Sequence, residues 1–131
     1  MASTEIIVCT TCRPPGASRE LPAEGLALFE AVQDALLLCG LDTGEHQGLQ
    51  LRGLACMSGC GRACTVTLQA QGKFTYYFGD LAGDAETAAQ VIACAQLHHQ
   101  SPDGNLARNA RPERLRSGIL ARLPPVGQEA A

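Results

Sequence analysis

Two short cysteine-rich segments constrain the fold of this chain more than any other feature, because each directly follows an apolar run. The first is Cys9-Thr10-Thr11-Cys12, which comes after Ile6-Ile7-Val8. The second runs from Cys56 to Cys64, places three thiols at C-x3-C-x3-C spacing among glycines, and follows the partly alternating segment 49–55. We predict that the two thiol loops meet in space and hold a metal centre.

The bulk composition is that of a single globular domain. The chain has 131 residues, of which 46% are hydrophobic and 18% charged, a balance that supports a folded core. No apolar stretch approaches the roughly 20 residues that cross a bilayer, and the first residues lack the basic and apolar regions of a signal peptide. We therefore expect a cytoplasmic protein without a membrane partner. Seven cysteines in a reducing compartment indicate metal binding or redox chemistry rather than disulfides.

Charge is distributed unevenly within the net value of −3. Residues 1–107 hold five basic and eleven acidic residues, whereas residues 108–131 hold five arginines and two glutamates. We divide the chain into a metal- or cluster-binding domain, 1–100, and a basic C-terminal extension, 101–131. The extension is either solvated and paired within the molecule or a docking patch for an acidic partner or anionic ligand. Because the total charge is acidic and the aromatic residues do not interleave with the arginines, we expect no nucleic-acid partner.

Hydrophobic periodicity predicts the element order βαββα. A helix begins near Pro22 and ends near Cys39 and Gly40, and a second helix is N-capped by Asp84. After the second helix we expect only a helical turn at 112–116 in an otherwise irregular tail. The predicted strands are residues 5–9, 49–55, 65–70 and 74–78, the last two forming a hairpin. This order fits an α/β protein with a thioredoxin-like core, in which helices accompany a four-stranded mixed sheet.

The topology has a consequence for the thiols. A β-α-β unit has a right-handed crossover and parallel strands, so both strands end at the same edge of the sheet. Cys9 ends the first predicted strand and Cys56 follows the second. The two thiol loops should therefore emerge side by side.

Clustered cytoplasmic thiolates bind soft metals, chiefly zinc or iron–sulfur clusters. The C-x3-C-x3-C spacing departs from the paired C-x2-C knuckles of zinc ribbons and favours a cluster. A C-x-x-C after the first strand of a thioredoxin-like core also permits thiol–disulfide chemistry, although a Pro-Pro-Gly loop separates Cys9 and Cys12 from the helix start. Cys39 and Cys94 lie at apolar helix positions and are predicted to be buried and structural. We interpret His98-His99 as a solvated helix end rather than as metal ligands.

The segments that carry these thiols resemble those of the thioredoxin-like [2Fe-2S] ferredoxins, from Ile6 to about Leu97. Val8-Cys9, followed by Arg13-Pro14-Pro15-Gly16, is similar to the first ligand loop of that family, and Cys56-Met57-Ser58-Gly59-Cys60 is similar to its C-x3-C pair. The resemblance implies a [2Fe-2S] cluster with Cys9, Cys56 and Cys60 as ligands.

The fourth ligand departs from the ferredoxin pattern, because no cysteine stands near Ser18, where that family supplies one. Cys12 and Cys64 are the two candidates, and we favour Cys12. The chain also resembles an uncharacterised bacterial family described as predicted metal-binding proteins, through Cys-Thr-Thr-Cys-Arg at residues 9–13, Gly79-Asp80-Leu81 and Arg111-Pro112. That resemblance implies metal binding without naming the metal.

The sequence therefore predicts an iron–sulfur electron carrier rather than an enzyme, with a redox partner protein. A zinc or other metal-ion protein, structural or delivering metal to a partner, is the alternative, and a C-x-x-C thiol oxidoreductase is the second alternative. The arginines Arg13, Arg52 and Arg62 flank the predicted site, where they either offset the charge of an anionic cluster or are ordinary surface residues. A homodimer is compatible with the sequence.

Overall fold

The computed structural model describes residues 3–14, 16, 20–38, 48–58 and 60–127, apart from the side chains of Leu38 and Cys60. The elements are β1 (Thr4–Cys9), α1 (Glu24–Leu38), β2 (Leu49–Leu54), the 3-10 turn η1 (Cys60–Arg62), β3 (Val66–Gln69), β4 (Thr75–Phe78), α2 (Ala85–Gln100), the 3-10 turn η2 (Arg108–Ala110), α3 (Arg114–Ser117) and β5 (Ile119–Leu123). The four predicted strands and the two predicted helices are present, but their order from β1 to α2 is βαβββα, so the predicted order βαββα was one strand short. The predicted end of α1 at Cys39 and Gly40 lies outside the described residues.

One mixed sheet of five strands, in the order β2-β1-β3-β4-β5, forms the centre of the fold. β1 and β2 are parallel, from Thr4 opposite Leu49 to Cys9 opposite Leu54, and β3 pairs antiparallel with β1. The mixed α/β class is confirmed, but the prediction of four strands was wrong. β5 pairs antiparallel with β4 and adds a fifth strand. It is an edge strand without a fully buried residue, so it lacks the alternation that identified the other strands.

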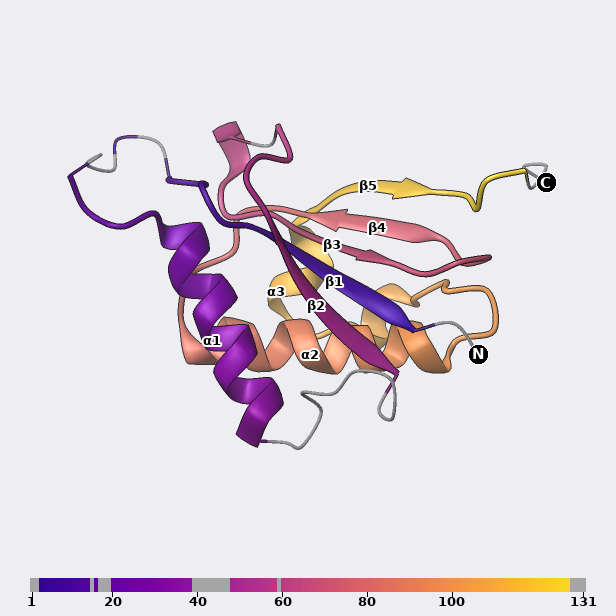
Figure 1. Ribbon diagram of the computed structural model, residues 1–131. Helices are drawn as coiled ribbons and strands as arrows, with labels where there is room; N and C mark the ends of the chain where they lie inside the picture. The colour runs from indigo at the N-terminus through magenta and orange to yellow at the C-terminus, as the bar shows by residue number, and fades with distance from the viewer. Residues whose placement is uncertain (1–2, 15, 17–19, 39–47, 59, 128–131) are drawn as a thin grey trace.

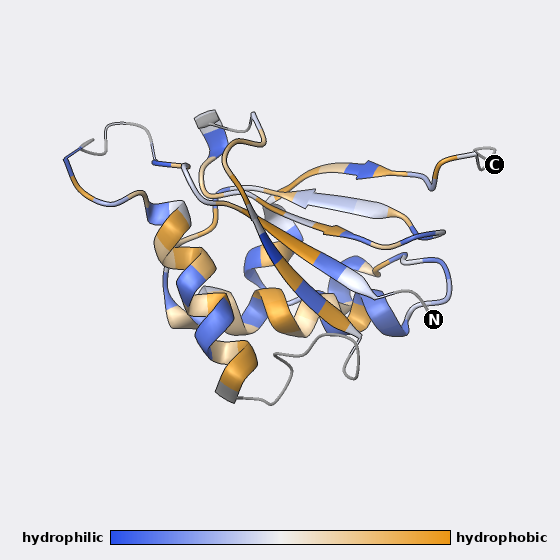
Figure 2. Cartoon of the chain, in the orientation of Figure 1, coloured by the Kyte–Doolittle hydropathy of each residue, from blue (hydrophilic) through white to orange (hydrophobic). Residues whose placement is uncertain are grey.

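All helices lie on one side of the sheet (Figure 1). Apolar residues run along β1 and recur along α1 and α2 (Figure 2). Ile6 and Val8 are fully buried and Ile7 between them is 5% exposed, as expected for a strand that is covered on both faces. Asp84 caps α2, since its carboxylate accepts a hydrogen bond of 2.8 Å from Thr87 N, as predicted. No helix among the described residues is long and apolar enough to cross a membrane.

Arginines of the C-terminal segment make contacts within the molecule. Arg116 Nε donates to the Arg111 carbonyl at 2.8 Å. The Arg122 guanidinium lies 4.2 Å from the centre of the Phe74 ring, and its Nε donates to Asn105 Oδ1 at 3.0 Å. These contacts favour internal pairing over a docking patch for these two side chains.

His98 is a buried residue of α2 that ties the helix to the sheet. Its ring accepts a hydrogen bond at Nδ1 from the Thr4 hydroxyl at 2.8 Å and donates from Nε2 to the Phe74 carbonyl at 2.7 Å, because a carbonyl can only accept. The interpretation of this helix end as solvated was wrong for His98, which is 0% exposed. Burial lowers its pKa, and the charges of Lys73 and His99 act in the same direction, against the hydrogen bond to Phe74. The folded protein therefore holds His98 neutral.

We predict that the free energy of unfolding decreases as the pH falls from 7 toward 5. The pKa of His98 is lower in the folded than in the unfolded chain, so the unfolded chain binds more protons in this range. The contribution of His98 to the free energy of unfolding is complete above the pKa of histidine in the unfolded chain, about 6.5. This contribution is lost as the pH falls toward the lower pKa of His98 in the folded protein. Urea unfolding of the reduced protein at pH 7, 6 and 5 measures this dependence. His98→Gln should flatten it, whereas the control His99→Gln should keep it; an equal dependence in both variants would refute the role of His98.

Candidate metal centre

The parallel pairing of β1 with β2 brings parts of the two thiol loops into contact. Cys9 is the last residue of β1, and the ladder continues beyond it through a bond of 2.9 Å from Thr10 N to the Leu54 carbonyl. Cys9 Sγ lies 3.9 Å from the carbonyl oxygen of Ala55. The segment after β2 therefore lies directly against the thiol that ends β1.

Cys9 and Cys12 form a buried pair, with exposed fractions of 1% and 2%. Burial raises the pKa of Cys9, but hydrogen bonds from the Cys12 thiol, from the backbone N–H groups of Met57 and Thr11, and from the Thr11 hydroxyl outweigh it, so that the pKa is lowered. Burial and the hydrogen bond to Cys9 raise the pKa of Cys12 to about 11. Cys12 Sγ also lies 3.7 Å from the Thr65 hydroxyl. Of the two sulfurs, Cys9 is thus the one surrounded by donors that stabilise a thiolate.

Cys64 is the third thiol at this end of the sheet and is 0% exposed. Its backbone pairs with Leu81 through bonds of 3.0 and 3.1 Å, which fix it beside the start of β3. Burial raises its pKa to about 12, and the charges of Glu24, Cys12 and Cys9 contribute in the same direction. Cys64 therefore stays protonated in the metal-free protein.

Cys56, in the second thiol loop, differs from the three buried thiols in its exposure to solvent. This thiol is exposed and accepts a hydrogen bond of 3.3 Å from Ser58 N, and Ser58 adopts a left-handed conformation with φ of +62°. Cys60 begins η1, and its side chain lies outside the described residues. Within the part of the chain that the structure describes, no three His, Cys, Asp or Glu side chains are grouped closely enough to hold a metal ion. The ligand set predicted from sequence is therefore not assembled by the described residues alone.

Hydroxyl groups that the sequence did not single out tether the segment that follows β2. The Thr11 hydroxyl donates to the Ala55 carbonyl. The Tyr77 hydroxyl donates to the Met57 carbonyl at 3.0 Å, and the Thr67 hydroxyl lies 3.5 Å from Met57 Sδ. Strand alternation places Thr67 and Tyr77 on the same face of the sheet, but it does not reveal that the loop reaches them.

The start of α1 lies against the C-x-x-C loop. Gly25 N donates to the Cys12 carbonyl at 3.0 Å, and a Cβ at Gly25 would lie only 1.9 Å from the Cys9 carbonyl oxygen. Position 25 therefore requires glycine for this close approach. Although the Pro-Pro-Gly loop separates the thiols from α1 in sequence, the start of the helix returns to the backbone of the C-x-x-C loop at Gly25.

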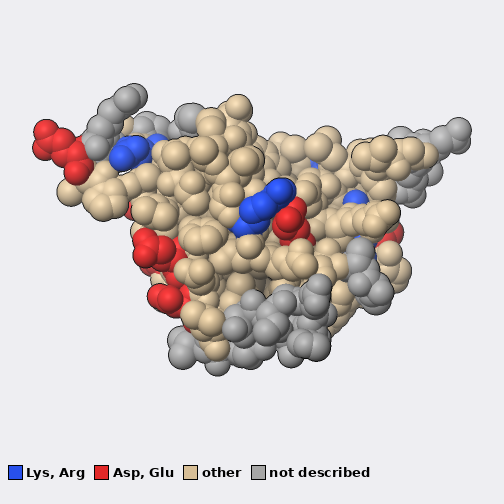
Figure 3. Space-filling model, in the orientation of Figure 1, with Lys and Arg blue, Asp and Glu red and all other residues tan. Residues whose placement is uncertain are grey.

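Two of the three flanking arginines already have carboxylate partners. Arg52 is 3.0 Å from Glu5, and Arg62 forms a bidentate ion pair with Asp80. Arg13 donates to the Leu21 carbonyl at 3.1 Å instead. On the face shown in Figure 3, acidic side chains gather over α1, and much of the surface beside them is uncharged. Among the three arginines, Arg52 and Arg62 therefore have their charges paired with neighbouring carboxylates rather than with the thiols.

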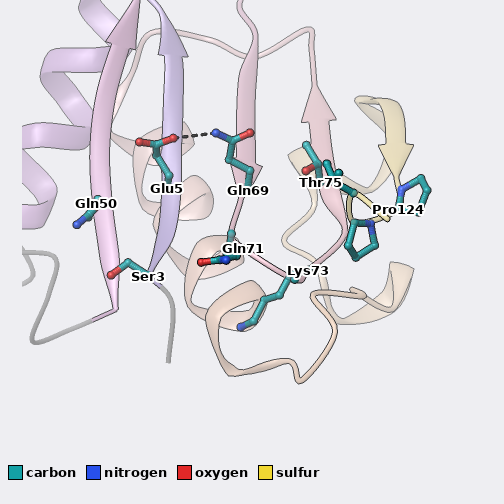
Figure 4. A pocket seen from close by; sticks show the side chains of 12 residues that line it. Ser3, Glu5, Gln50, Gln69, Gln71, Lys73, Thr75 and Pro124 are labelled. Carbon is teal, nitrogen blue, oxygen red and sulfur yellow. Dashed lines mark hydrogen bonds between the residues drawn. The ribbon is translucent and has the colours of Figure 1, made fainter. Parts of the chain in front are cut away.

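A groove of about 640 Å³ lies on the sheet face away from the helices and is lined by polar side chains, including Glu5, Gln69 and Lys73 (Figure 4). Gln69 Nε2 donates to Glu5 at 2.8 Å across its floor. The groove lies near the start of β1, whereas Cys9 ends that strand. It is therefore separate from the thiol site.

The chemistry of the donor set fits a soft metal or an iron–sulfur cluster. Cys9, Cys12 and Cys64 belong to one buried cluster at the same end of the sheet, and the backbone N–H of Ser58 donates to the Cys56 sulfur. Hydrogen bonds of this kind stabilise thiolates and tune the potential of a cluster. Fold and site together define a thioredoxin-like α/β protein with a cysteine-rich end of the sheet.

Residues 6–125 match the family described as "Protein of unknown function (DUF1636)", and the chain belongs to this family. The solved structure of a thioredoxin-like [2Fe-2S] ferredoxin from Aquifex aeolicus shares the fold, with a TM-score of 0.56 and 15% sequence identity. The match covers 98% of this chain and 100% of that one. At this identity the likeness concerns the fold. A comparison with curated proteins gives no match.

Burial predicts a wide spread of thiol reactivity in the reduced, metal-free protein. Cys56 is exposed, whereas Cys64 and Cys94 are 0% exposed and burial raises the pKa of each to about 12. At pH 8 only about one in ten thousand such buried thiols is ionised, so iodoacetamide should label them at least about a thousandfold more slowly than Cys56. Peptide mass spectrometry over time measures the rates. In urea the three rates should converge; a native Cys64 as reactive as Cys56 would contradict the described packing.

Proposed function

We propose that this protein is an electron carrier that binds a [2Fe-2S] cluster through Cys9, Cys12, Cys56 and Cys60. The observation that carries the proposal is the contact between Cys9 and the segment after β2, in which Cys9 Sγ lies 3.9 Å from the Ala55 carbonyl oxygen. The loop backbone thus lies at the sulfur pair of the first loop. The shared fold of the Aquifex aeolicus ferredoxin supports the same interpretation.

When bound, such a cluster supplies a one-electron redox couple. The protein contributes ligation and environment. Cys9 and Cys12 provide sulfurs from a site that is closed to water, and the Met57 and Thr11 N–H groups stabilise the thiolate charge of Cys9. Cys56 comes from the exposed side, which gives electrons a route to a redox partner protein. Binding releases protons, because Cys12 is protonated in the metal-free protein. Cytoplasmic location and a homodimer remain predictions.

We assign the fourth ligand to Cys12 rather than Cys64. Cys12 is hydrogen-bonded to Cys9 and leaves β1 in the same loop, whereas Cys64 is held by its backbone ladder with Leu81. Cys12→Ser should therefore abolish the visible chromophore after anaerobic purification, while Cys64→Ser should retain most of it. Visible absorption with iron and sulfide analysis measures the loading.

Cys94→Ser is the matched control, because Cys94 is a buried thiol of α2 outside the two thiol loops. It should keep the chromophore. Loss in Cys64→Ser with retention in Cys12→Ser would reverse the assignment of the fourth ligand. A wild-type protein that contains zinc, no sulfide and no colour would refute the cluster and establish the metal-ion alternative.

The second candidate is a thiol oxidoreductase that uses Cys9 and Cys12. One observation favours it: the two thiols are hydrogen-bonded and their pKa values shift in opposite directions, as in a nucleophilic and a resolving cysteine. Their exposed fractions of 1% and 2% count against it, because a protein disulfide needs access to the attacking sulfur. Rapid reduction of an exposed protein disulfide by the reduced, metal-free protein would support this candidate.

A further inference from the structure

We propose that the hydroxyl groups of Tyr77 and Thr67 form a clamp on Met57 that holds the second thiol loop over Cys9. The two are positioning residues that act through Met57. Their effect on a bound cluster rests on the proposed function, whereas the clamp itself is a property of the metal-free protein.

The clamp spans several strands of the sheet. Met57 follows β2 at one edge, but Thr67 lies on β3 and Tyr77 on β4, and β1 lies between them and β2. With strands about 4.8 Å apart, β4 is about 14 Å from β2. The segment after β2 must therefore fold across the end of β1 to reach these hydroxyls. Cys9 is the last residue of β1 and lies under this crossing, which explains its exposed fraction of 1%.

The two hydroxyls act on one residue from the same face. Thr67 and Tyr77 are direct cross-strand partners in the β3–β4 ladder, so their side chains stand next to each other. Tyr77 holds the Met57 carbonyl at 3.0 Å, and Thr67 lies 3.5 Å from its thioether sulfur. Two residues earlier in the same loop, the Ala55 carbonyl oxygen lies 3.9 Å from Cys9 Sγ. The backbone and side chain of Met57 are thus restrained together, next to the part of the loop that contacts Cys9.

The test uses Tyr77→Phe, with Tyr76→Phe as the matched control. Tyr76 is the neighbouring residue of β4 on the opposite face of the sheet, where its hydroxyl accepts a hydrogen bond from Leu106 N at 2.9 Å. Each substitution removes a single hydroxyl from the same strand. The readout is the alkylation rate of Cys9 in the reduced, metal-free protein, with Cys94 in the same sample reporting openings that are not confined to the loop.

Tyr77→Phe should raise the rate at Cys9 about fivefold, the factor expected for one net hydrogen bond, and leave Cys94 unchanged. Adding Thr67→Val should raise the Cys9 rate further. Tyr76→Phe should leave the ratio of the Cys9 and Cys94 rates at its wild-type value. An unchanged Cys9 rate in Tyr77→Phe, or an equal rise at Cys9 and Cys94, would overturn the clamp.

The cluster-loaded protein gives a second, independent readout. Loosening the loop changes the exposure of a cluster at Cys9 to water, so Tyr77→Phe should shift the midpoint potential while Tyr76→Phe should not. Equal potentials in the two variants would overturn the role of the clamp toward the cluster. If the wild-type protein binds no cluster, the proposed function fails, and the alkylation rates alone decide the clamp.

Discussion

The parallel pairing of β1 with β2 is the interaction on which the rest of the structure depends. It sets Cys9 opposite Leu54 and so brings two segments that are distant in sequence to one edge of the sheet. A parallel pair needs a crossover, and α1 provides it while covering the same face as α2. The start of that helix at Gly25 then lies against the first thiol loop. The pairing of β1 with β2, the helical crossover and the position of the thiol site therefore all follow from the same topology.

The buried thiols are also part of the hydrophobic core. Cys9, Cys12 and Cys64 pack with Val8 and Leu28 in the same buried cluster. An isolated thiolate in such surroundings is costly, which is why burial raises the pKa of Cys12 and Cys64. Of these three thiols, Cys9 is the one whose hydrogen-bond donors reverse this effect. The core therefore holds Cys12 and Cys64 as neutral thiols.

Sequence reasoning found the features that depend on local pattern. The β-branched run of β1, the Asp84 cap and the buried face of α2 follow directly from periodicity. It missed β5 because an edge strand lacks a buried alternating face, and it missed the burial of His98 because its partners, Thr4 and Phe74, lie far away in the chain. At the site, the cysteines were visible as a motif, but the hydroxyls that hold the loop required the three-dimensional register of the sheet.

β5, the strand that the sequence did not reveal, affects the thiol site through its pairing with β4. Tyr77 stands opposite Ala121 in the β4–β5 ladder, and Gly79 N donates to the Gly118 carbonyl at 2.7 Å, so the C-terminal segment holds the end of β4. Arg122 packs on Phe74 at the other end of the same strand. The C-terminal segment thus restrains the strand whose Tyr77 hydroxyl reaches Met57. Arg122 contributes to this attachment, and the position of a loop beside Cys9 depends on residues more than a hundred positions later in the chain.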